Sequence, residues 1–381
     1  MRLLIRAVLR PSLTIYFLLL CLSTFSLHGQ AGANVPRIKG DVAPGAEWQR
    51  TSPESVGYSS SKLEALRGWL KTQDTSSMVV VVQGRIIFSY GDLSHTSKVA
   101  SVRKSVLGML YGNYVFNGTI DLGKTVNQLG LDDKEAFLPI EADVTLEQLL
   151  TSRSGIYIAT DNEDQKKVLP PRGSEYPGSH YFYNNWDFDS AGVAFEKLTG
   201  KDIYQALQTD LAMPLGMQDY LISKQKRDDA QVSQHRGYAM YLSTRDMARL
   251  GLLMLDSVTW NGKNLIPGDW VRYMTTLITP FRDMNPTGLR NYGEPERWGY
   301  GSLWWVWDQP YFPGSTYIGF LQGAYSAMGS GGQYITVLPA KDMVVVHQVD
   351  IDKDSGAFVS PSSYIAMLSM IANAYCDNDC K

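Results

Sequence analysis

The alternation of apolar and polar positions predicts β-strands near both ends of the chain. Residues 78–91, MVVVVQGRIIFSYG, contain two β-rich runs, and Gln83-Gly84 between them is typical of a hairpin turn. Three more β-rich stretches lie toward the C-terminus, at 299–308, 320–333 and 333–350. The last of them has a turn around Pro339 to Asp342. The simplest compact arrangement joins strands from both ends in one sheet.

Helical periodicity fills the section between these strands and also flanks them. A first amphipathic helix is predicted within 60–74 and a closing helix within 361–376. From about 105 to 295 the pattern is mostly helix and loop, with helical segments at 145–155, 187–200, 202–216 and 243–256.

These elements predict an α/β (α+β) fold with one mainly antiparallel sheet, covered by the first and last helices. We expect a single domain over 45–375. Its α/β lobe takes in about 45–104 and 296–375, and an inserted helical lobe takes in about 105–295. Residues 376–381 form a C-terminal tail. The junction of the lobes is the expected place for a site, because clefts between lobes favour ligand binding.

The N-terminus predicts a secretory signal peptide over residues 1–31, cleaved near Ala31. Three arginines precede an apolar core, LTIYFLLLCLSTFSL, and the small residues of HGQAGA follow it. The apolar core is too short for a membrane anchor. Cys21 follows three leucines rather than a small residue, which argues against a lipoprotein site. We therefore expect a periplasmic or secreted protein with no stable membrane anchor.

Charge and cysteine content narrow the classes of partner. The 381-residue chain has a formal net charge of −3, and losing the three signal arginines makes it more acidic. A mildly acidic protein has no electrostatic reason to bind nucleic acid or anionic membranes. Cys376 and Cys380 favour a small disulfide loop over free thiols in an oxidising compartment. Two cysteines with no histidine nearby do not make a metal site, and no cofactor motif is present.

A serine three residues ahead of a lysine occurs at three places, and context separates them. Ser59 begins an exposed amphipathic helix, and Ser223 lies in a solvated charge run. Only Ser101 precedes a mostly apolar helix, so Lys104 falls in a turn that should be buried. Burying an ammonium without a partner is costly. Ser101 and Lys104 are therefore either a nucleophile with its base, or a capping serine with a snorkelling lysine.

The second candidate element is a Y-x-N pattern at Tyr183 and Asn185. The other copy begins at Tyr111, which lies about 15 Å along the helix from Ser101 and cannot reach it. Tyr183 falls in a loop and is free to relay a proton, although it also fits a packing aromatic. No G-x-S-x-G nucleophile elbow is present, and no histidine stands in such a context.

The third candidate element is the glycine-rich strand YSAMGSGGQ, which contains Gly329 and Ser330. Glycine lets a ligand approach the backbone closely, so an amide here and that of Ser101 could form an oxyanion hole. A tight hairpin strand is the equally good alternative.

Together these segments resemble the serine β-lactamase-related hydrolases, which include class C β-lactamases, D-alanyl-D-alanine carboxypeptidases, family VIII esterases and nylon-oligomer (6-aminohexanoate-dimer) hydrolases. The resemblance covers about 45–375. It rests, in the family's order, on ASVRKSVLG, TLEQLLTSRSGI, YPGSHYFYNNWDFDSAG, PLGM, STRDMARLGLLML, GYGSLWWVWD and MGSGGQ.

The resemblance implies a role for each candidate. Ser101 matches the acylated nucleophile and Lys104 the lysine that takes its proton. Tyr183 matches the tyrosine that shuttles the proton, and Asn185 the asparagine that orients substrate or lysine. Gly329 belongs to the third motif, and the Ser330 N–H matches the second oxyanion donor. The implied reaction needs no cofactor.

One departure bears on the substrate. β-Lactamases and cell-wall peptidases have K-T-G in the third motif, where this chain has Ala327, Met328 and Gly329. The missing cation favours neutral small-molecule esters or amides, as in the esterase and nylon-oligomer branch. A β-lactamase or D-Ala-D-Ala carboxypeptidase and a non-catalytic penicillin-binding-like module are the alternatives.

Three further features are candidates for substrate contact. The tryptophans of SLWWVWD are expected to pack in the core or to wall an acyl pocket. Arg153 and the acidic loop 160–164 are expected to be solvated charges, with substrate contact as the alternative.

Overall fold

The computed structural model describes residues 43–162, 169–256, 260, 262–284, 297–308, 320–354 and 356–376. The predicted signal peptide and Cys380 lie outside these ranges. Cys376 is disulfide-bonded, which is consistent with the predicted disulfide loop.

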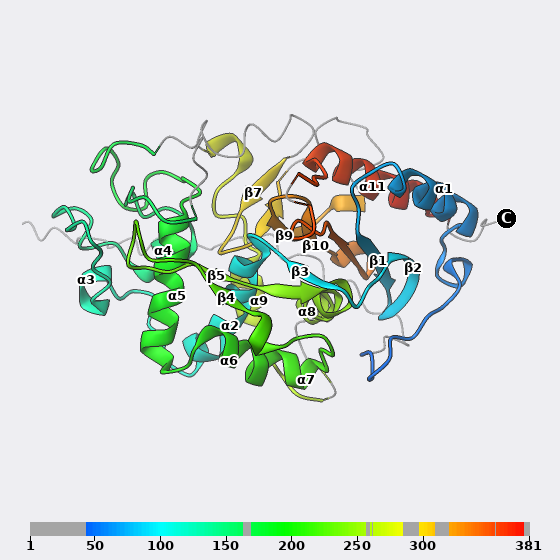
Figure 1. Cartoon of the computed structure of the whole chain (residues 1–381), viewed down its shortest axis with the longest axis horizontal. Coiled ribbons are helices and arrows are strands. Elements are labelled where there is room, and N and C mark those ends of the chain that lie inside the picture. Colours follow the sequence, from blue (N-terminus) through cyan, green and yellow to red (C-terminus); the bar gives the residue numbers. More distant parts are fainter. Residues whose placement is uncertain are drawn as a thin grey trace, which may run out of the picture. The chain divides into compact units, whose positions relative to one another are not determined.

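A seven-stranded sheet is built from both ends of the chain, as predicted (Figure 1). Its order is β2-β1-β11-β10-β9-β8-β7, and every neighbouring pair is antiparallel. The strands are β1 (Ser77–Val82), β2 (Arg85–Gly91), β7 (Trp298–Tyr300), β8 (Trp305–Trp307), β9 (Tyr325–Gly329), β10 (Gln333–Leu338) and β11 (Met343–Gln348).

The hairpin between β1 and β2 turns at the predicted dipeptide. Gln83 and Gly84 both have positive φ, at 51° and 74°. Two consecutive residues with positive φ make the turn whose twist matches that of the strands it joins. The sequence prediction of this hairpin is confirmed.

Helices cover both faces of the sheet, which explains the unbroken valine runs of β1 and β11. Gly251 of α8 (Thr244–Asp256) lies so close to Ile335 and Val344 that a Cβ would meet both side chains. Tyr364 of α11 (Pro361–Ala374) stacks on Tyr334, the neighbour of Ile335 in β10. Consecutive strand residues point to opposite faces, so α8 and α11 lie on opposite sides.

The first and last helices pack side by side, as expected (Figure 1). Arg67 of α1 (Ser60–Leu70) lies over the Phe88 ring of β2 and donates to the Ser89 carbonyl. The helix α8, however, lies within the range 105–295 that we assigned to the helical lobe, and it packs on β1, β10 and β11. The apolar stripe of α8 is the same whether it faces a sheet or other helices, so the pattern did not distinguish them.

The remaining elements lie mainly in the section between the strands. The helices are α2 (Val102–Phe116), α3 (Val126–Leu129), α4 (Leu146–Leu150), α5 (Asn185–Thr199), α6 (Ile203–Ala206), α7 (Met213–Leu215) and α9 (Gly268–Met274). Short helical turns are η1 (Pro53–Val56), η2 (Leu207–Ala212), η3 (Ile222–Lys224), η4 (Phe281–Asp283) and η6 (Pro339–Lys341). Two small ladders pair β3 (Thr96–Lys98) with β6 (Tyr241–Ser243), and β4 (Lys226–Arg227) with β5 (Tyr238–Ala239).

Two kinds of feature are absent from the described ranges. None of their helices is long and apolar enough to cross a membrane. They also hold no group of three metal-binding side chains.

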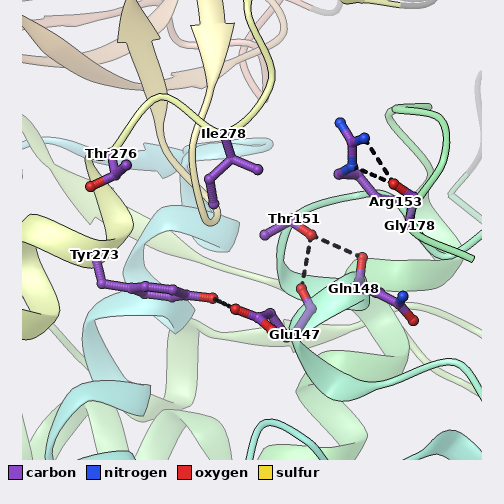
Figure 2. Close-up of a pocket in the computed structure, with 8 residues that line it drawn as sticks. All are labelled: Glu147, Gln148, Thr151, Arg153, Gly178, Tyr273, Thr276 and Ile278. Atoms are coloured by element: carbon purple, nitrogen blue, oxygen red, sulfur yellow. Dashed lines mark hydrogen bonds between the residues drawn. The ribbon is translucent and has the colours of Figure 1, made fainter. Parts of the chain in front are cut away.

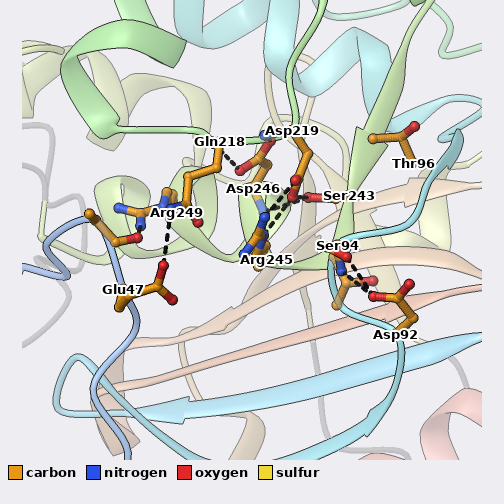
Figure 3. A network of polar contacts seen from close by, with 12 residues as sticks. Glu47, Asp92, Ser94, Thr96, Gln218, Asp219, Ser243, Arg245, Asp246 and Arg249 are labelled. Atoms are coloured by element: carbon orange, nitrogen blue, oxygen red, sulfur yellow. Dashed lines mark hydrogen bonds and ion pairs between the residues drawn. The ribbon is translucent and has the colours of Figure 1, made fainter.

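Two charged side chains of α8 hold neighbouring segments in place (Figure 3). Arg249 donates to the carbonyls of Leu215 and of the segment 44–46. Asp246 accepts the backbone N–H groups of Gln218 and Asp219. Burial raises the pKa of Asp246 to about 6, and the charge of Asp219 adds to the rise. These bonds satisfy backbone groups that the loops leave unpaired.

His347 links β11 to the turn after β9. Its Nδ1 lies 2.6 Å from the Gly332 carbonyl oxygen, and its Nε2 lies 2.9 Å from Thr75 Oγ1. A carbonyl only accepts, so Nδ1 carries the proton and Nε2 accepts from the Thr75 hydroxyl. The ring is fully buried, and burial lowers the pKa of His347 to about 4.

We predict that this histidine makes stability fall with acid. The unfolded chain binds the proton below pH 6.5 and the folded chain only near pH 4, so the stabilisation present at neutral pH is lost as pH falls. The loss from pH 7 to pH 4 amounts to about 3 kcal/mol. Urea unfolding at several pH values is compared for the wild type and His347→Gln. Parallel pH profiles of the two proteins would contradict the assignment.

Candidate active site

The start of α2 is a tight turn that carries Ser101. The amide of Val102 donates to the Val99 carbonyl, and the amide of Lys104 to the Ser101 carbonyl. Ala100 has φ of 46°, a left-handed conformation that costs a residue with a Cβ about 1 kcal/mol or more. Such strain next to a reactive side chain is common at functional sites.

Ser101 occupies the N-cap position of α2, but its hydroxyl makes no capping bond. Instead, Lys104 Nζ donates to Ser101 Oγ at 3.0 Å. The capping alternative is therefore wrong for this serine, and so is the snorkelling lysine, because only 2% of Lys104 is exposed. Residues three apart on a helix share a face, which is how the two meet.

Lys104 joins the separate sequence motifs into one cluster. Its Nζ donates to Tyr183 Oη at 2.9 Å and to Asn185 Oδ1 at 2.7 Å, besides Ser101. It also lies 4.3 Å from the ring centroid of Tyr183 and 4.6 Å from that of Phe188. A nitrogen touching two hydroxyls can pass a proton between them, which is the task of a base in nucleophilic catalysis.

Tyr183 is both a packing aromatic and a partner of Lys104. Its ring stacks on Trp305 at 5.5 Å and tilts against Phe188 at 4.8 Å, while its hydroxyl reaches the lysine. The two sequence interpretations are thus compatible. Trp304 is buried against Tyr325, as the core interpretation predicts for the tryptophans. Trp305 instead supports the ring of the proposed proton shuttle.

Gly329 lies directly against the start of α2. A Cβ built on it would be 2.5 Å from the Val99 carbonyl oxygen and 3.0 Å from Ser101 N, so no side chain fits. The exposed Ser330 follows it in the chain. This close approach brings the third motif beside the Ser101 amide, the arrangement that an oxyanion hole requires. The catalytic roles of all these residues stay predictions.

A buried ion pair beside the cluster was not predicted from the sequence. Arg103 Nη2 donates to Asp189 Oδ1 at 2.9 Å, with 7% and 1% of the two side chains exposed. Burial lowers the pKa of Arg103 and the Asp189 charge raises it, with a net rise. The available signal was an arginine inside an apolar helix, since arginine is rarely buried unless paired.

Arg153 and the described part of the acidic loop make hydrogen bonds to neighbouring segments, and their contact with substrate stays a prediction. Arg153 donates to the carbonyls of Gly178 and Ser179 and to the Thr279 hydroxyl. It lines a cavity of about 370 Å³ with Tyr273, whose hydroxyl bonds Glu147 (Figure 2).

The carboxylate of Asp161 accepts backbone amides of residues 231–233, so it holds a neighbouring loop. Asn162 joins the cluster around Lys104, because its carbonyl accepts from Asn185 Nδ2 at 3.0 Å. Residues 163–164 of the acidic loop lie outside the described ranges.

A family comparison covers the part of the chain that carries the cluster. The family model described as Beta-lactamase matches residues 75–359. The chain belongs to this family. The match contains all the candidate residues of the cluster, from Ser101 to Ser330.

Solved structures show the same fold. A putative 6-aminohexanoate-dimer hydrolase from Bacillus anthracis is 20% identical, with a TM-score of 0.62 and coverage of 86% of this chain and 87% of that one. A class C beta-lactamase mutant is 15% identical, with a TM-score of 0.57 and coverage of 82% and 96%. The β-lactamase-like fold predicted from the sequence is confirmed.

A curated relative is similar over a shorter stretch. Monacolin J acid methylbutanoyltransferase of Aspergillus terreus is 27% identical over 164 residues, or 35% of this chain. The chain spans 39% of the length of that relative.

Proposed function

We propose that this protein is a serine hydrolase that cleaves ester or amide bonds of small molecules through an acyl-enzyme on Ser101. The observation that carries the proposal is the buried amine of Lys104, in hydrogen-bond contact with both Ser101 Oγ and Tyr183 Oη. A serine hydroxyl is a weak nucleophile until a neighbouring base takes its proton. The family and the fold support the hydrolase class.

Acylation follows from the contacts of the cluster. Ser101 Oγ attacks the substrate carbonyl carbon, and its proton passes to Lys104 Nζ, which reacts in its neutral form. The carbonyl oxygen becomes an oxyanion beside the amides of Ser101 and Ser330. As the bond to the leaving group breaks, that group takes a proton through the Tyr183 hydroxyl.

Deacylation reverses these transfers with water as the nucleophile. The water gives one proton to the Tyr183–Lys104 pair while its oxygen bonds to the acyl carbon. The acyl bond to Ser101 then breaks, the carboxylic acid leaves, and Oγ regains a proton. The aromatic packing of Tyr183 on Trp305 keeps its hydroxyl within reach in both halves.

Ala327 supports a neutral substrate class. Ala327 and Gly329 are two apart in β9 and so share the face that meets α2. Alanine is fully buried where β-lactamases have lysine, so that position offers no charge to a substrate carboxylate. Ala327→Lys is a poor test of this preference, because a long charged side chain in a packed position costs stability by itself.

We predict a preference for neutral acyl groups. Charge-assisted hydrogen bonds contribute roughly 1.5–3 kcal/mol each, or about ten- to over a hundredfold in kcat/KM. We expect p-nitrophenyl butyrate to be cleaved that much faster than p-nitrophenyl hemisuccinate, which differs by a terminal carboxylate. The measurement is kcat/KM for both esters, with their spontaneous hydrolysis subtracted.

Nitrocefin tests the main alternative in the same assay. A wild-type enzyme that prefers nitrocefin and the hemisuccinate over the butyrate would overturn the esterase assignment in favour of a β-lactamase. Failure to turn over any of the three, together with no acylation of Ser101, would favour the non-catalytic module.

A further inference from the structure

Asn162 is held by three side-chain hydrogen bonds beside the cluster. Its Nδ2 donates to Asp189 Oδ2 at 3.1 Å and to Asp228 Oδ2 at 3.0 Å. Its Oδ1 accepts from Thr160 Oγ1 at 2.9 Å. The side chain is therefore fixed in position, and with it the main-chain carbonyl, which accepts from Asn185 Nδ2 at 3.0 Å.

This carbonyl decides which end of the Asn185 amide faces Lys104. An amide side chain can be turned by 180° to exchange its oxygen and nitrogen. A carbonyl only accepts, so the NH₂ end of Asn185 must point to Asn162. The oxygen end is then directed at Lys104 Nζ, which it meets at 2.7 Å. The reversed amide would present N–H donors to an amine that also donates.

The ion pair of Arg103 with Asp189 connects the same parts. Arg103 adjoins Lys104 on α2, and Asp189 lies one turn after Asn185 on α5. Asp189 uses one oxygen for Arg103 and the other for Asn162. The two helices that carry the cluster are therefore joined by a buried charge pair.

From this juxtaposition we propose that Asn162 is a positioning residue, which orients the Asn185 amide and thereby holds Lys104 against Ser101. The inference rests on the proposed function and adds a residue outside the serine, lysine and tyrosine set. Asn162 touches no reacting atom in this scheme. It acts through the amide of Asn185.

A pH profile separates positioning from a general effect on structure. The titratable groups that interact with Lys104 are Tyr183 from its loop and Asp189 from α5, beside the neutral amide of Asn185. The adjacent Arg103 is paired with Asp189 and lies over the Tyr238 ring, and Asp228 accepts from Asn162. An acceptor bonded to an ammonium favours the charged form. Losing the Asn185 oxygen should therefore lower the pH at which Lys104 becomes a base.

The test is the rate at which a fluorophosphonate labels Ser101 in the full chain, measured from pH 5 to 10. We expect Asn162→Ala to lower the plateau rate constant roughly 10- to 100-fold, as expected for a lost hydrogen bond to a charged group. We also expect the acidic limb of its pH–rate profile, the range in which the labelling rate rises with pH, to move down by about one pH unit. Asn127→Ala, at an exposed position on α3, is the control and should match the wild type.

A second variant disturbs Asn162 without removing it. A Cβ on Gly237 would lie 2.1 Å from Asp228 Oδ2 and 2.3 Å from Asn162 Nδ2. Both atoms end flexible side chains, so Gly237→Ala should displace them and keep the fold. Gly237→Ala should slow labelling of Ser101 and shift the acidic limb of the pH–rate profile in the same direction. If Asn162→Ala does not fold, Gly237→Ala alone tests the positioning role.

The outcomes are distinct. Unchanged labelling in both variants, or a slower plateau with an unmoved acidic limb, would overturn the positioning role. Wild-type protein that is not labelled at Ser101 would instead overturn the proposed function itself.

Discussion

Ser101→Ala is expected to abolish ester hydrolysis while the protein stays folded. The hydroxyl is the group that Lys104 contacts at the helix start, and it makes no capping bond that the helix would miss. Removing the nucleophile of an enzyme that works through an acyl intermediate lowers kcat by roughly 10⁴- to 10⁶-fold. The measurement is turnover of p-nitrophenyl butyrate, with circular dichroism and thermal unfolding as checks on the fold.

The chain supplies its own control for this prediction. Ser223 stands three residues before Lys226 in the same S-x-x-K spacing, but it is exposed. Ser223→Ala should therefore retain wild-type activity. If Ser101→Ala kept most of its turnover, Ser101 would be removed from the mechanism.

Lys104→Ala and Tyr183→Phe are expected to lower kcat strongly, each by about 10²-fold or more. They share one proton path through the 2.9 Å contact between Lys104 Nζ and Tyr183 Oη. Groups that act as a unit are not additive. The double variant should therefore be little worse than the worse single variant, as measured by kcat on p-nitrophenyl butyrate.

The same set of single and double variants can contradict the proton relay between Lys104 and Tyr183. Factors that multiply in the double variant would show that lysine and tyrosine act independently. Lys62→Ala is the matched control, because Lys62 is the exposed lysine of the S-x-x-K copy that begins at Ser59, and it donates to the Asn373 carbonyl instead. It should leave kcat unchanged.

Local patterns predicted much of this fold because the local and the long-range requirements agree. The hairpin at Gln83-Gly84 needs positive φ at two positions, and the sequence supplies residues that tolerate it. The valine runs of β1 and β11 are buried strands whose partners follow from the antiparallel order. Each of these signals spans only a few residues.

The candidate site was predictable where family motifs mark it, and less so where contacts alone define it. Spacing brings Ser101 and Lys104 together on one helix, whereas Tyr183 and Asn185 arrive from 79 and 81 residues away. For Asn162 the sequence predicted only membership of the acidic loop 160–164, because its proposed role depends on a main-chain carbonyl. The packing of α8 on the sheet was also not predicted, because an apolar stripe looks the same whether it packs on a sheet or on other helices.

The covalent intermediate tests the central claim most directly. Wild-type enzyme is mixed with excess p-nitrophenyl butyrate, quenched in acid within the first turnover, digested with trypsin and analysed by mass spectrometry. Cleavage after Lys98 and Arg103 releases residues 99–103, VASVR, whose only hydroxyl is that of Ser101. We predict one butyryl group on this peptide and none on it in Ser101→Ala. A butyryl group on another peptide, or hydrolysis with no acylated peptide at any quench time, would contradict the account.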